Sequence, residues 1–409
     1  MENVSSSNGL EKRPKLRFPG FDEQYRTITL GQIASLVNRT DPTSNAPIMM
    51  LSAGNGFIMQ SEKYSRDNAG QSLKKYILLK KGELAYNHGA SKAKQYGCCY
   101  ELTEDEARIP YVYHCFKVSG AEHTPYVATA LNNPKIDRQL KRLVSSSVRM
   151  DGLLNISFDD YMSVILHLPS LKEQTHIADF LKKLDERITA QEKLVASLKK
   201  YKRGLLRKVF AKLSDSCEKR NLKEVSVLFA DGDWIESKDQ ALDGIRLIQT
   251  GNVGFGVYID KTQNAKYISE TTFHRLNCLE IYDGDILISR LPEPAGRACL
   301  LPKSTERRIT AVDCTVIRTD SSVIDRNYLL QFLCSEQYLK TVNSFLAGGT
   351  RQRISRKNLE GIEVPYPSID EQRYWGSFLC KVDARISNEE QRRSSLSRLR
   401  CFMLQQLFI

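Results

Sequence analysis

The chain has 409 residues, of which 41% are hydrophobic, and a formal net charge of +12 at pH 7. This length allows two or three domains with cores of their own, and no apolar run approaches the roughly eighteen residues that a membrane span needs. The excess of Lys and Arg favours a polyanionic partner such as nucleic acid, and a basic surface that only aids solubility is the alternative. The ten cysteines lack metal-like spacing and the N-terminus lacks a signal-peptide pattern, so we expect a cytoplasmic protein with reduced thiols and no membrane.

The first part of the chain is expected to contain an N-terminal arm at 1–23 and an α+β domain at 24–170. Within this domain, the stretch "YILLKKGELAYN" at 76–87 places Gly82 and Glu83 between two apolar runs. A glycine and an acidic residue between apolar runs are typical of a tight turn between paired strands. The sequence therefore predicts a β-hairpin here.

A long helix is predicted at 171–213. Pro169 and Ser170 mark its start, and Glu173 places negative charge in the first turn, near the positive end of the helix dipole. Apolar or small polar residues then recur at alternating spacings of four and three over about four heptads. This pattern is typical of a coiled coil rather than of an ordinary surface helix.

The following segment, 214–368, is expected to form a second α+β domain. Its stretch "LEIYDGDILISR" at 279–290 has Gly284 and Asp285 between apolar runs and predicts a second hairpin. Short runs of Val, Ile, Leu and Thr broken by Gly and Asp predict short strands, and 328–345 has the spacing of an amphipathic helix. Both domains should contain mainly antiparallel sheet.

A second long helix is predicted at 369–409, and it repeats the first. Shifting the chain against itself by 198 residues aligns 168–210 with 366–408, and 15 of these 43 positions are identical. The alignment continues upstream, so each copy should include a globular domain and the helix that follows it. In each helix the recurring heptad positions form one stripe, here called the seam. The two seams are expected to pack against each other through Ile177, Leu181, Leu184, Ile188, Val195, Leu198, Leu379, Val382, Ile386, Leu396 and Met403.

Polar residues interrupt both seams, and the second seam is the more polar of the two. Gln191, Glu389 and Arg393 stand at heptad positions that are usually apolar. Two interpretations stay open: these residues fix the register of the helix pair, or they are exposed where the helices splay.

Several Gly-flanked basic loops could contact DNA. Reading bases requires side chains with paired donors and acceptors on loops or helix starts that can enter a groove. Gly348 and Gly349 give one such loop the backbone freedom to approach DNA closely, and Ser355 can cap whatever element follows, which would hold the arginines on a defined turn. A merely solvated turn is the alternative for each loop. The candidate DNA contacts are Asn87, His88, Lys92, Lys94, Asn252, Arg290, Arg297, Arg351, Gln352 and Arg353.

The sequence contains no recognisable catalytic or metal-binding motif. It lacks a phosphate-binding loop of the G-x-x-x-x-G-K-[ST] type, and Gly251, Gly254 and Gly256 have the wrong spacing for a dinucleotide or methyl-donor loop. The six histidines do not cluster at metal-ligand spacings. We therefore expect no catalytic residue, metal or cofactor in this chain.

The doubled "P-x-x-x-E-Q" helix entry, at Pro169 and Pro367, resembles that of the specificity subunits of type I restriction-modification systems. The resemblance extends over nearly the whole chain: "KLRFPGF" near the start, the two Gly-acid pairs, "GGTRQRIS" at 348–355, and the helix ends "KRGLLRKVF" and "FMLQQLF". It implies two tandem target recognition domains separated by two long helices that pack as an antiparallel coiled coil, with a pseudo-two-fold repeat.

The resemblance also implies a function. Each domain would read one half of a bipartite site in double-stranded DNA, and the helices would set the spacing and dock two methyltransferase subunits. Restriction and translocase subunits would complete the assembly. Catalysis would lie in these partners, with S-adenosylmethionine in the methyltransferase and ATP and magnesium in the restriction subunit. The alternative is an intracellular coiled-coil scaffold with two protein-binding domains.

Overall fold

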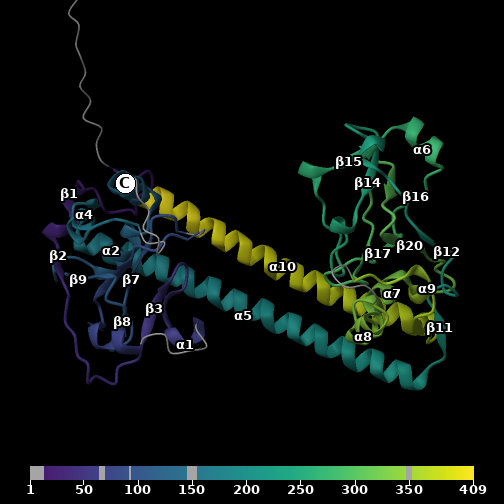
Figure 1. The fold of residues 1–409 in the computed structure, drawn as a ribbon, viewed down its shortest axis with the longest axis horizontal. Coiled ribbons are helices and arrows are strands. Elements are labelled where there is room, and N and C mark those ends of the chain that lie inside the picture. Colours follow the sequence, from purple (N-terminus) through teal and green to yellow (C-terminus); the bar gives the residue numbers. More distant parts are fainter. Residues whose placement is uncertain (1–12, 64–69, 92–93, 145–153, 347–351) are drawn as a thin grey trace, which may run out of the picture. The chain divides into compact units, whose positions relative to one another are not determined.

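The computed structural model describes residues 13–63, 70–91, 94–144, 154–346 and 352–409 (Figure 1). The chain divides into two compact units. Unit one comprises Met1–Ala190 and Arg393–Ile409, and unit two comprises Gln191–Arg392. Each unit thus contains a globular domain and part of both long helices. The boundaries between the units fall inside the helices predicted at 171–213 and 369–409.

Unit one is built from short antiparallel strands and small helices. Its four-stranded sheet has the order β2-β9-β6-β7, and three two-stranded pairs accompany it: β1 with β10, β3 with β4, and β5 with β8. The strands are β1 (Arg26–Thr29), β2 (Ala34–Leu36), β3 (Met49–Ser52), β4 (Gly56–Met59), β5 (Ile77–Lys80), β6 (Leu84–Asn87), β7 (Cys98–Glu101), β8 (Glu106–Ile109), β9 (His114–Val118) and β10 (Ile165–Leu168). The helices are η1 (Leu30–Gln32), α1 (Gln60–Lys63), η2 (Gly70–Lys75), α2 (Thr124–Leu131), α3 (Pro134–Leu143) and α4 (Phe158–Met162).

The main core of unit one joins the four-stranded sheet to helices. Tyr86 on β6 stacks on Tyr161 of α4 with ring centroids 3.9 Å apart, and both side chains are almost completely buried. The same apolar cluster includes Leu181 of the first long helix and Phe408, just beyond the end of the second. Burying these aromatic and aliphatic side chains supplies most of the favourable energy of folding.

Unit two contains two larger sheets. A four-stranded antiparallel sheet has the order β12-β20-β17-β18, and a five-stranded sheet has the order β13-β15-β14-β19-β16 with one parallel pair, β14 and β19. β11 pairs with β21. The strands are β11 (Lys219–Asn221), β12 (Leu228–Asp231), β13 (Gln240–Ala241), β14 (Ile245–Ile248), β15 (Lys266–Ile268), β16 (Glu280–Ile281), β17 (Ile286–Ser289), β18 (Ala298–Leu300), β19 (Arg308–Thr310), β20 (Cys314–Arg318) and β21 (Glu363–Pro365). The helices are η3 (Ser237–Asp239), η4 (Thr250–Asn252), η5 (Thr262–Asn264), α6 (Glu270–Leu276), α7 (Arg326–Leu333), α8 (Glu336–Ser344) and α9 (Arg356–Glu360).

Within unit two, helices α7 and α8 lie beside the segments of the two long helices, whereas β14, β15 and α6 lie in the part of the domain away from them (Figure 1). The main core of this unit packs α7 against both long helices. One smaller apolar cluster lies at the five-stranded sheet, and another joins this sheet to the four-stranded sheet. Apolar contacts with the four-stranded sheet thus hold the five-stranded sheet to the rest of the domain.

The two long helices are α5 (Leu171–Ser216) and α10 (Ile369–Leu407). In unit two they run antiparallel, because Gln191 contacts Glu389 and, farther along α5, Lys202 pairs with Asp383. In unit one the two helices meet through the pair of Asp185 and Arg400. Of the predicted seam residues, the structure buries Ile177, Leu181, Leu184, Val195, Leu379 and Ile386, and it partly buries Ile188, Leu198, Val382, Leu396 and Met403. The predicted fold class, two α+β domains with two long antiparallel helices and an internal repeat, is confirmed. Among the described residues, no helix is apolar and long enough to span a membrane.

The polar seam residues behave in two ways. In unit two, Gln191 donates a hydrogen bond to the Glu389 carboxylate at 2.7 Å, and Glu389 is 1% exposed. Arg393, in unit one, is exposed. The interpretation that polar groups fix the register therefore suits Gln191 and Glu389, and exposure describes Arg393.

The repeat is visible in the architecture. The orders β2-β9-β6-β7 and β12-β20-β17-β18 correspond strand by strand, and β1 with β10 corresponds to β11 with β21. Ser157 and Ser355 cap equivalent short helices, α4 and α9, by accepting hydrogen bonds from Asp160 N and Asn358 N. The expected cap at Ser355 is thus observed.

The two predicted hairpins are wrong. β5 pairs with β8 and β6 with β7 and β9, so the turn at Gly82 and Glu83 carries the chain from one sheet to another. The turn at Gly284 and Asp285 does the same between β16 and β17. Both glycines have the positive φ expected of a turn. The acid after each is buried and pairs with an arginine from elsewhere in its domain, as in Arg39–Glu83 and Arg318–Asp285.

The helix expected at 328–345 is two helices. α7 ends at Leu333 and α8 begins at Glu336. Ser335 caps the second helix, since its hydroxyl accepts a hydrogen bond from Tyr338 N at 3.2 Å. The apolar periodicity continues across this break, so the sequence pattern did not reveal it.

Candidate nucleic-acid interface

Most arginines around the five-stranded sheet of unit two are held by carboxylates of the same domain. The pairs are Arg246 with Asp260 and Glu306, Arg275 with Asp239, Arg307 with Glu270 and Glu280, Arg308 with Asp283, and Arg318 with Asp285. A guanidinium that already donates to a carboxylate has fewer donors left for a phosphate. The overall positive charge of the chain is thus a poor guide to where DNA would bind.

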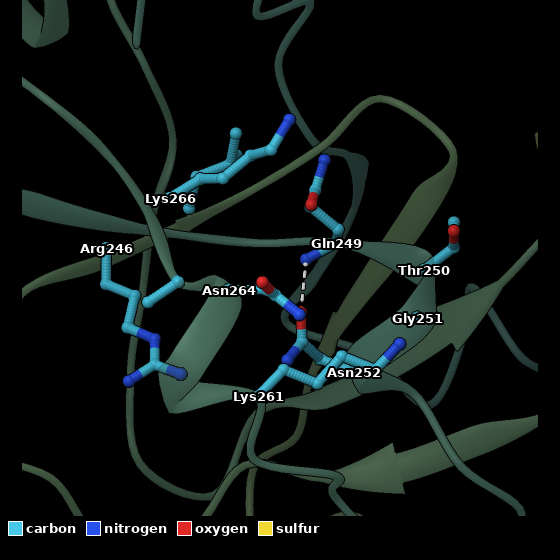
Figure 2. A pocket seen from close by; sticks show the side chains of 10 residues that line it. Arg246, Gln249, Thr250, Gly251, Asn252, Lys261, Asn264 and Lys266 are labelled. Atoms are coloured by element: carbon cyan, nitrogen blue, oxygen red, sulfur yellow. Dashed lines mark hydrogen bonds between the residues drawn. The ribbon is translucent and has the colours of Figure 1, made fainter. Parts of the chain in front are cut away.

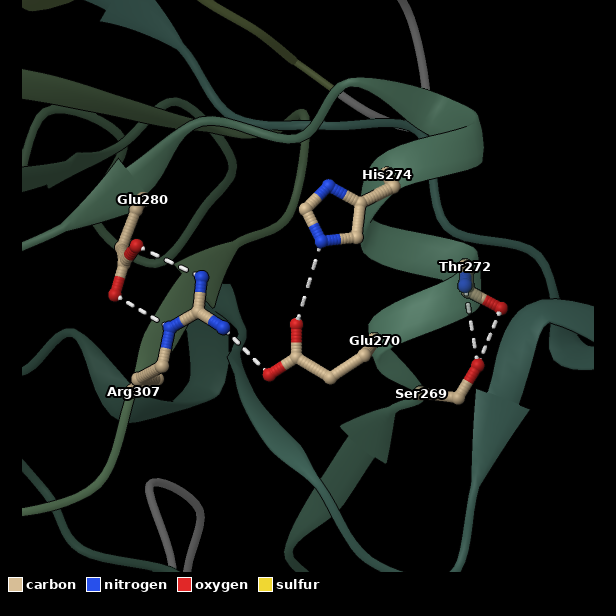
Figure 3. A network of polar contacts seen from close by, with 6 residues as sticks. All are labelled: Ser269, Glu270, Thr272, His274, Glu280 and Arg307. Atoms are coloured by element: carbon tan, nitrogen blue, oxygen red, sulfur yellow. Dashed lines mark hydrogen bonds and ion pairs between the residues drawn. The ribbon is translucent and has the colours of Figure 1, made fainter.

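Figure 3 shows the most extensive of these networks. Arg307 donates to both carboxylate oxygens of Glu280, at 2.9 and 3.0 Å, and to Glu270 at 2.5 Å. Its guanidinium also lies 4.8 Å from the centre of the Phe273 ring. Hydrogen bonds from Arg307 hold the pKa of the Glu280 carboxyl below its usual value. The network fastens α6 to the edge of the sheet.

Two predicted DNA contacts, Arg290 and Arg297, are engaged inside their domain. Arg290 is 4% exposed, and its guanidinium donates to Val312 O at 2.6 Å. Arg297 donates to Val253 O at 2.7 Å and to Thr250 O at 2.9 Å. Burial lowers the pKa of both guanidinium groups. In this conformation Arg297 positions the loop that contains η4.

Asn252 has a similar internal role. It is 6% exposed, its Oδ1 accepts a hydrogen bond from Gln249 N at 3.0 Å, and its Nδ2 donates to Ile259 O at 2.9 Å. Both ends of the amide are therefore used within the loop. Asn252 shapes the segment around η4.

The basic loop before α9 is accessible where it is described. Gln352 and Arg353 are exposed, and Arg353 lies 3.2 Å from Asp313. Arg351 lies outside the described residues. Contact between this loop and DNA stays a prediction.

The candidates in unit one gather around the end of β6. Asn87 Oδ1 accepts a hydrogen bond from Gly89 N at 2.9 Å, and Lys94 Nζ donates to Asn132 O at 2.6 Å. His88 is 6% exposed, and its two ring nitrogens lie 2.9 Å from the backbone oxygens of Leu154 and Val112. Lys92 lies outside the described residues. The described side chains hold the local backbone, and DNA contact by any of them stays a prediction.

A polar pocket of about 160 Å³ lies at the ends of β14 and β15, between η4 and η5 (Figure 2). Lys261 and Lys266, at the two ends of the segment 261–266, are among the residues that line it, and their ammonium groups point in different directions (Figure 2). Among the described residues neither ammonium group makes an ion pair or a hydrogen bond. The pocket is lined by Arg246, Leu247, Gln249, Thr250, Gly251, Asn252, Lys261, Asn264, Ala265 and Lys266.

Sequence reasoning found only Asn252 of this pocket. The stretch "KTQNAK" at 261–266 has the composition of a DNA-contacting loop, with two lysines and two amides within six residues. It lacks the flanking glycines that drew attention to the other loops. Only the pairing of β14 with β15 brings it beside η4.

Comparison with known proteins finds a family model that is similar to the second part of the chain. Residues 214–398 match the family model of the type I restriction modification DNA specificity domain. The chain is 23% identical over 273 residues to the type I restriction enzyme MjaVIII specificity subunit of Methanocaldococcus jannaschii, a match that covers 62% of this chain and 64% of that protein. It is 22% identical to the putative type I restriction enzyme MjaX specificity subunit of the same organism, over 56% of this chain and 55% of that one. The chain thus spans less than two thirds of the length of these curated relatives.

Solved structures share the fold over nearly the whole chain. The type I restriction-modification S subunit from M. genitalium superposes with a TM-score of 0.58 at 17% identity and covers 97% of this chain and 99% of its own. A chain from a study of complex assembly and conformational transition in the type I R-M system superposes with a TM-score of 0.56 at 18% identity, over 95% of this chain and 98% of its own. The chain thus shares the fold of these type I restriction-modification subunits, and its residues 214–398 are similar to the type I restriction modification DNA specificity domain.

Proposed function

We propose that this chain is the noncatalytic DNA-recognition and assembly subunit of a type I restriction-modification complex. Each globular domain reads one half of a bipartite site in double-stranded DNA. The long helices set the distance between the half-sites and dock two methyltransferase subunits. Restriction and translocase subunits join the complete assembly.

This proposal rests on one observation. The chain contains two copies of one domain architecture, and the second copy matches a DNA specificity domain. Two copies of a reader on one chain suit a DNA site with two parts. The domains share their four-stranded sheets, whereas the five-stranded sheet of unit two corresponds in the described part of unit one to two smaller pairs, β3 with β4 and β5 with β8, linked by a bridge between Ile48 and Arg108. Because the parts that differ carry different loops, the two half-sites should have different sequences.

Catalysis is assigned to the partners. The methyltransferase would use S-adenosylmethionine, and the restriction subunit would use ATP and magnesium. This chain would provide the affinity for DNA, the preference for a sequence and the distance between the two half-sites. The similarity of residues 214–398 to a DNA specificity domain favours this role over that of a coiled-coil scaffold with protein-binding domains, which would have no preference among DNA sequences.

The test is a binding and methylation assay with the complex of this chain and its methyltransferase partner. We expect one bipartite duplex from a randomised pool to be enriched, and both of its half-sites to be required for methylation. The chain alone should transfer no methyl group. Assembly with the partner but equal affinity for every duplex would contradict the proposal and favour the scaffold.

A further inference from the structure

The pocket between η4 and η5 is a feature of unit two to which the proposed function assigns no ligand. Hydrogen bonds within the domain fix the backbone around η4, which forms one side of the pocket. Arg297 fixes the carbonyls of Thr250 and Val253, and Asn252 bridges Gln249 N and Ile259 O. The rim therefore requires little ordering when a ligand binds, which favours affinity.

The charge of the pocket is not balanced by the protein. Arg246 lines one wall, but its guanidinium lies 2.5 Å from Asp260 and 3.4 Å from Glu306. Lys261 and Lys266 have no such partner among the described residues. Figure 2 shows both lysines among the pocket side chains, with Lys261 extending toward Gly251. A β-carbon built on Gly251 would lie 2.6 Å from Lys261 Nζ, so the absence of a side chain there leaves room for the ammonium group.

The lining indicates which ligand fits. Leu247 and Ala265 are its only apolar side chains, so the pocket offers no aromatic surface on which a base could stack. Its volume of about 160 Å³ is below the 300 to 1,000 Å³ that is usual for small-molecule sites. Lysine binds phosphate as a compact point charge, and a neutral amide such as that of Asn264 can donate to a phosphate oxygen.

We propose that Lys261 and Lys266 each bind a phosphate of the DNA backbone at this pocket and thereby fix the register of the second domain on its half-site. This inference rests on the proposed function. Phosphate contacts position a protein on the duplex without carrying sequence information. The pocket would set where the base-reading loops of the same domain meet the groove.

The test measures DNA affinity of the complex with its methyltransferase as a function of salt concentration. Lys261→Ala and Lys266→Ala should each weaken binding to the specific site and to unrelated duplexes by the same factor. Each loss of a phosphate contact should reduce the slope of log affinity against log salt by about 0.9. Raising the salt from 50 to 200 mM should therefore cost each variant about 3.5-fold less affinity than it costs the wild type. Gly251→Ala keeps both charges and displaces only a flexible chain end, so it should give a smaller loss.

The matched control is Lys340→Ala, because Lys340 is an exposed lysine on α8 in the same unit, away from the pocket lining. Wild-type affinity and salt slope in both pocket variants would overturn the inference while leaving the proposed function intact, provided that the wild type prefers a bipartite site. A changed preference at one base pair with an unchanged slope would also overturn it in favour of base contact. A third contrary outcome is inorganic phosphate that binds the DNA-free protein at micromolar concentration and loses this binding in Lys266→Ala, which would make the pocket a site for a free anion.

Discussion

Gln174 and Gln372 occupy equivalent positions in the two copies and explain why the chain repeats its helix entry. Each side chain is fully buried. Gln174 donates to Pro169 O and accepts from His123 N, and Gln372 donates to Pro367 O and accepts from Asp325 N. His123 and Asp325 are the capping residues of α2 and α7. One glutamine thus ties the start of a long helix to the start of a domain helix in each unit.

We predict that Gln372→Ala destabilises unit two by about 1–3 kcal/mol, because it leaves partly buried backbone groups without a partner. Urea unfolding followed by tryptophan fluorescence measures this, since both tryptophans, Trp234 and Trp375, belong to unit two. Gln391→Ala is the control, because Gln391 is exposed on the same helix. Equal unfolding midpoints for the two variants would show that the buried glutamine is dispensable.

His114 predicts a pH dependence for unit one. Burial lowers the pKa of its imidazole, and the neighbouring His88, with ring centroids 4.9 Å away, acts in the same direction. The hydrogen bond between His114 Nε2 and Ile156 O opposes these effects, and Tyr86, Tyr161 and Phe158 complete the surroundings of the ring. A lowered pKa means that the folded state favours the neutral imidazole, so the unfolded chain binds the proton first as the pH falls.

The stability contributed by neutral His114 should therefore be complete above the ordinary histidine pKa of about 6.5 and should decline as the pH falls below it. His114→Asn removes the titration, and its stability should fall less steeply than that of the wild type between pH 7 and pH 5. Hydrogen exchange of amides in β6 and β9 would report on unit one. His274→Asn, an exposed site in unit two, should keep the wild-type slope. A parallel pH profile for His114→Asn would refute the assignment.

The long helices show how polar residues can serve a coiled coil. Glu389 is buried in the seam of unit two and meets Gln191 from α5 as well as Arg385 and Arg392 from its own helix. The hydrogen bond from Gln191 lowers the pKa of the Glu389 carboxyl. Each group of this polar pair meets the other in only one register, so sliding the helices would leave the buried Glu389 carboxylate and the partly buried Gln191 amide without a partner.

We expect Glu389→Ala to destabilise unit two, because it leaves the Gln191 amide without its carboxylate partner. The double variant Gln191→Leu with Glu389→Leu should be neutral or stabilising, since two apolar residues can pack in the seam. Tryptophan-detected urea unfolding compares them. A double variant less stable than Glu389→Ala would show that the pair contributes stability and does not merely specify the register.

The length of the helices leads to a prediction about the DNA site. Inserting one heptad after Val195 lengthens α5 by about 10 Å, which corresponds to about three base pairs of duplex. If the helices set the spacing, the nonspecific gap in the recognised sequence should grow, or binding should fail because α10 no longer matches. Sequencing of methylated DNA would report the gap. Modification of the original site by the variant would show that the helices do not set the spacing.

At the scale of the molecule, the two domains share a four-stranded sheet packed against helices, and they differ in the strands and loops attached to it. The shared sheets pack against helices that include α5 and α10, whereas the five-stranded sheet of unit two bears its own loops and the basic pocket. Sequence preference should therefore be modular, with each domain acting on its own stretch of duplex.

Exchanging residues 24–168 for the equivalent domain of a relative should change one half of the recognised site and leave the other half unchanged. Enrichment of duplexes from a randomised pool, with the methyltransferase partner present, would show both halves at once. The reciprocal exchange of the second domain is the control and should alter the other half. Changes in both halves after a single exchange would contradict the modular picture.

The sequence by itself determined the features that depend on local periodicity and on repetition. Heptad spacing predicted helices starting at 171 and 369 and the residues of their seams, and the shift of 198 residues revealed the duplication, because these patterns are written along the chain. Tertiary structure decided the features that depend on partners far apart in sequence. It separated β5 from β6, gave Arg290 and Arg297 internal carbonyl partners, and left Lys261 and Lys266 without any among the described residues. Whether a charged side chain is free to bind depends on what folds against it, and a sequence pattern cannot show that.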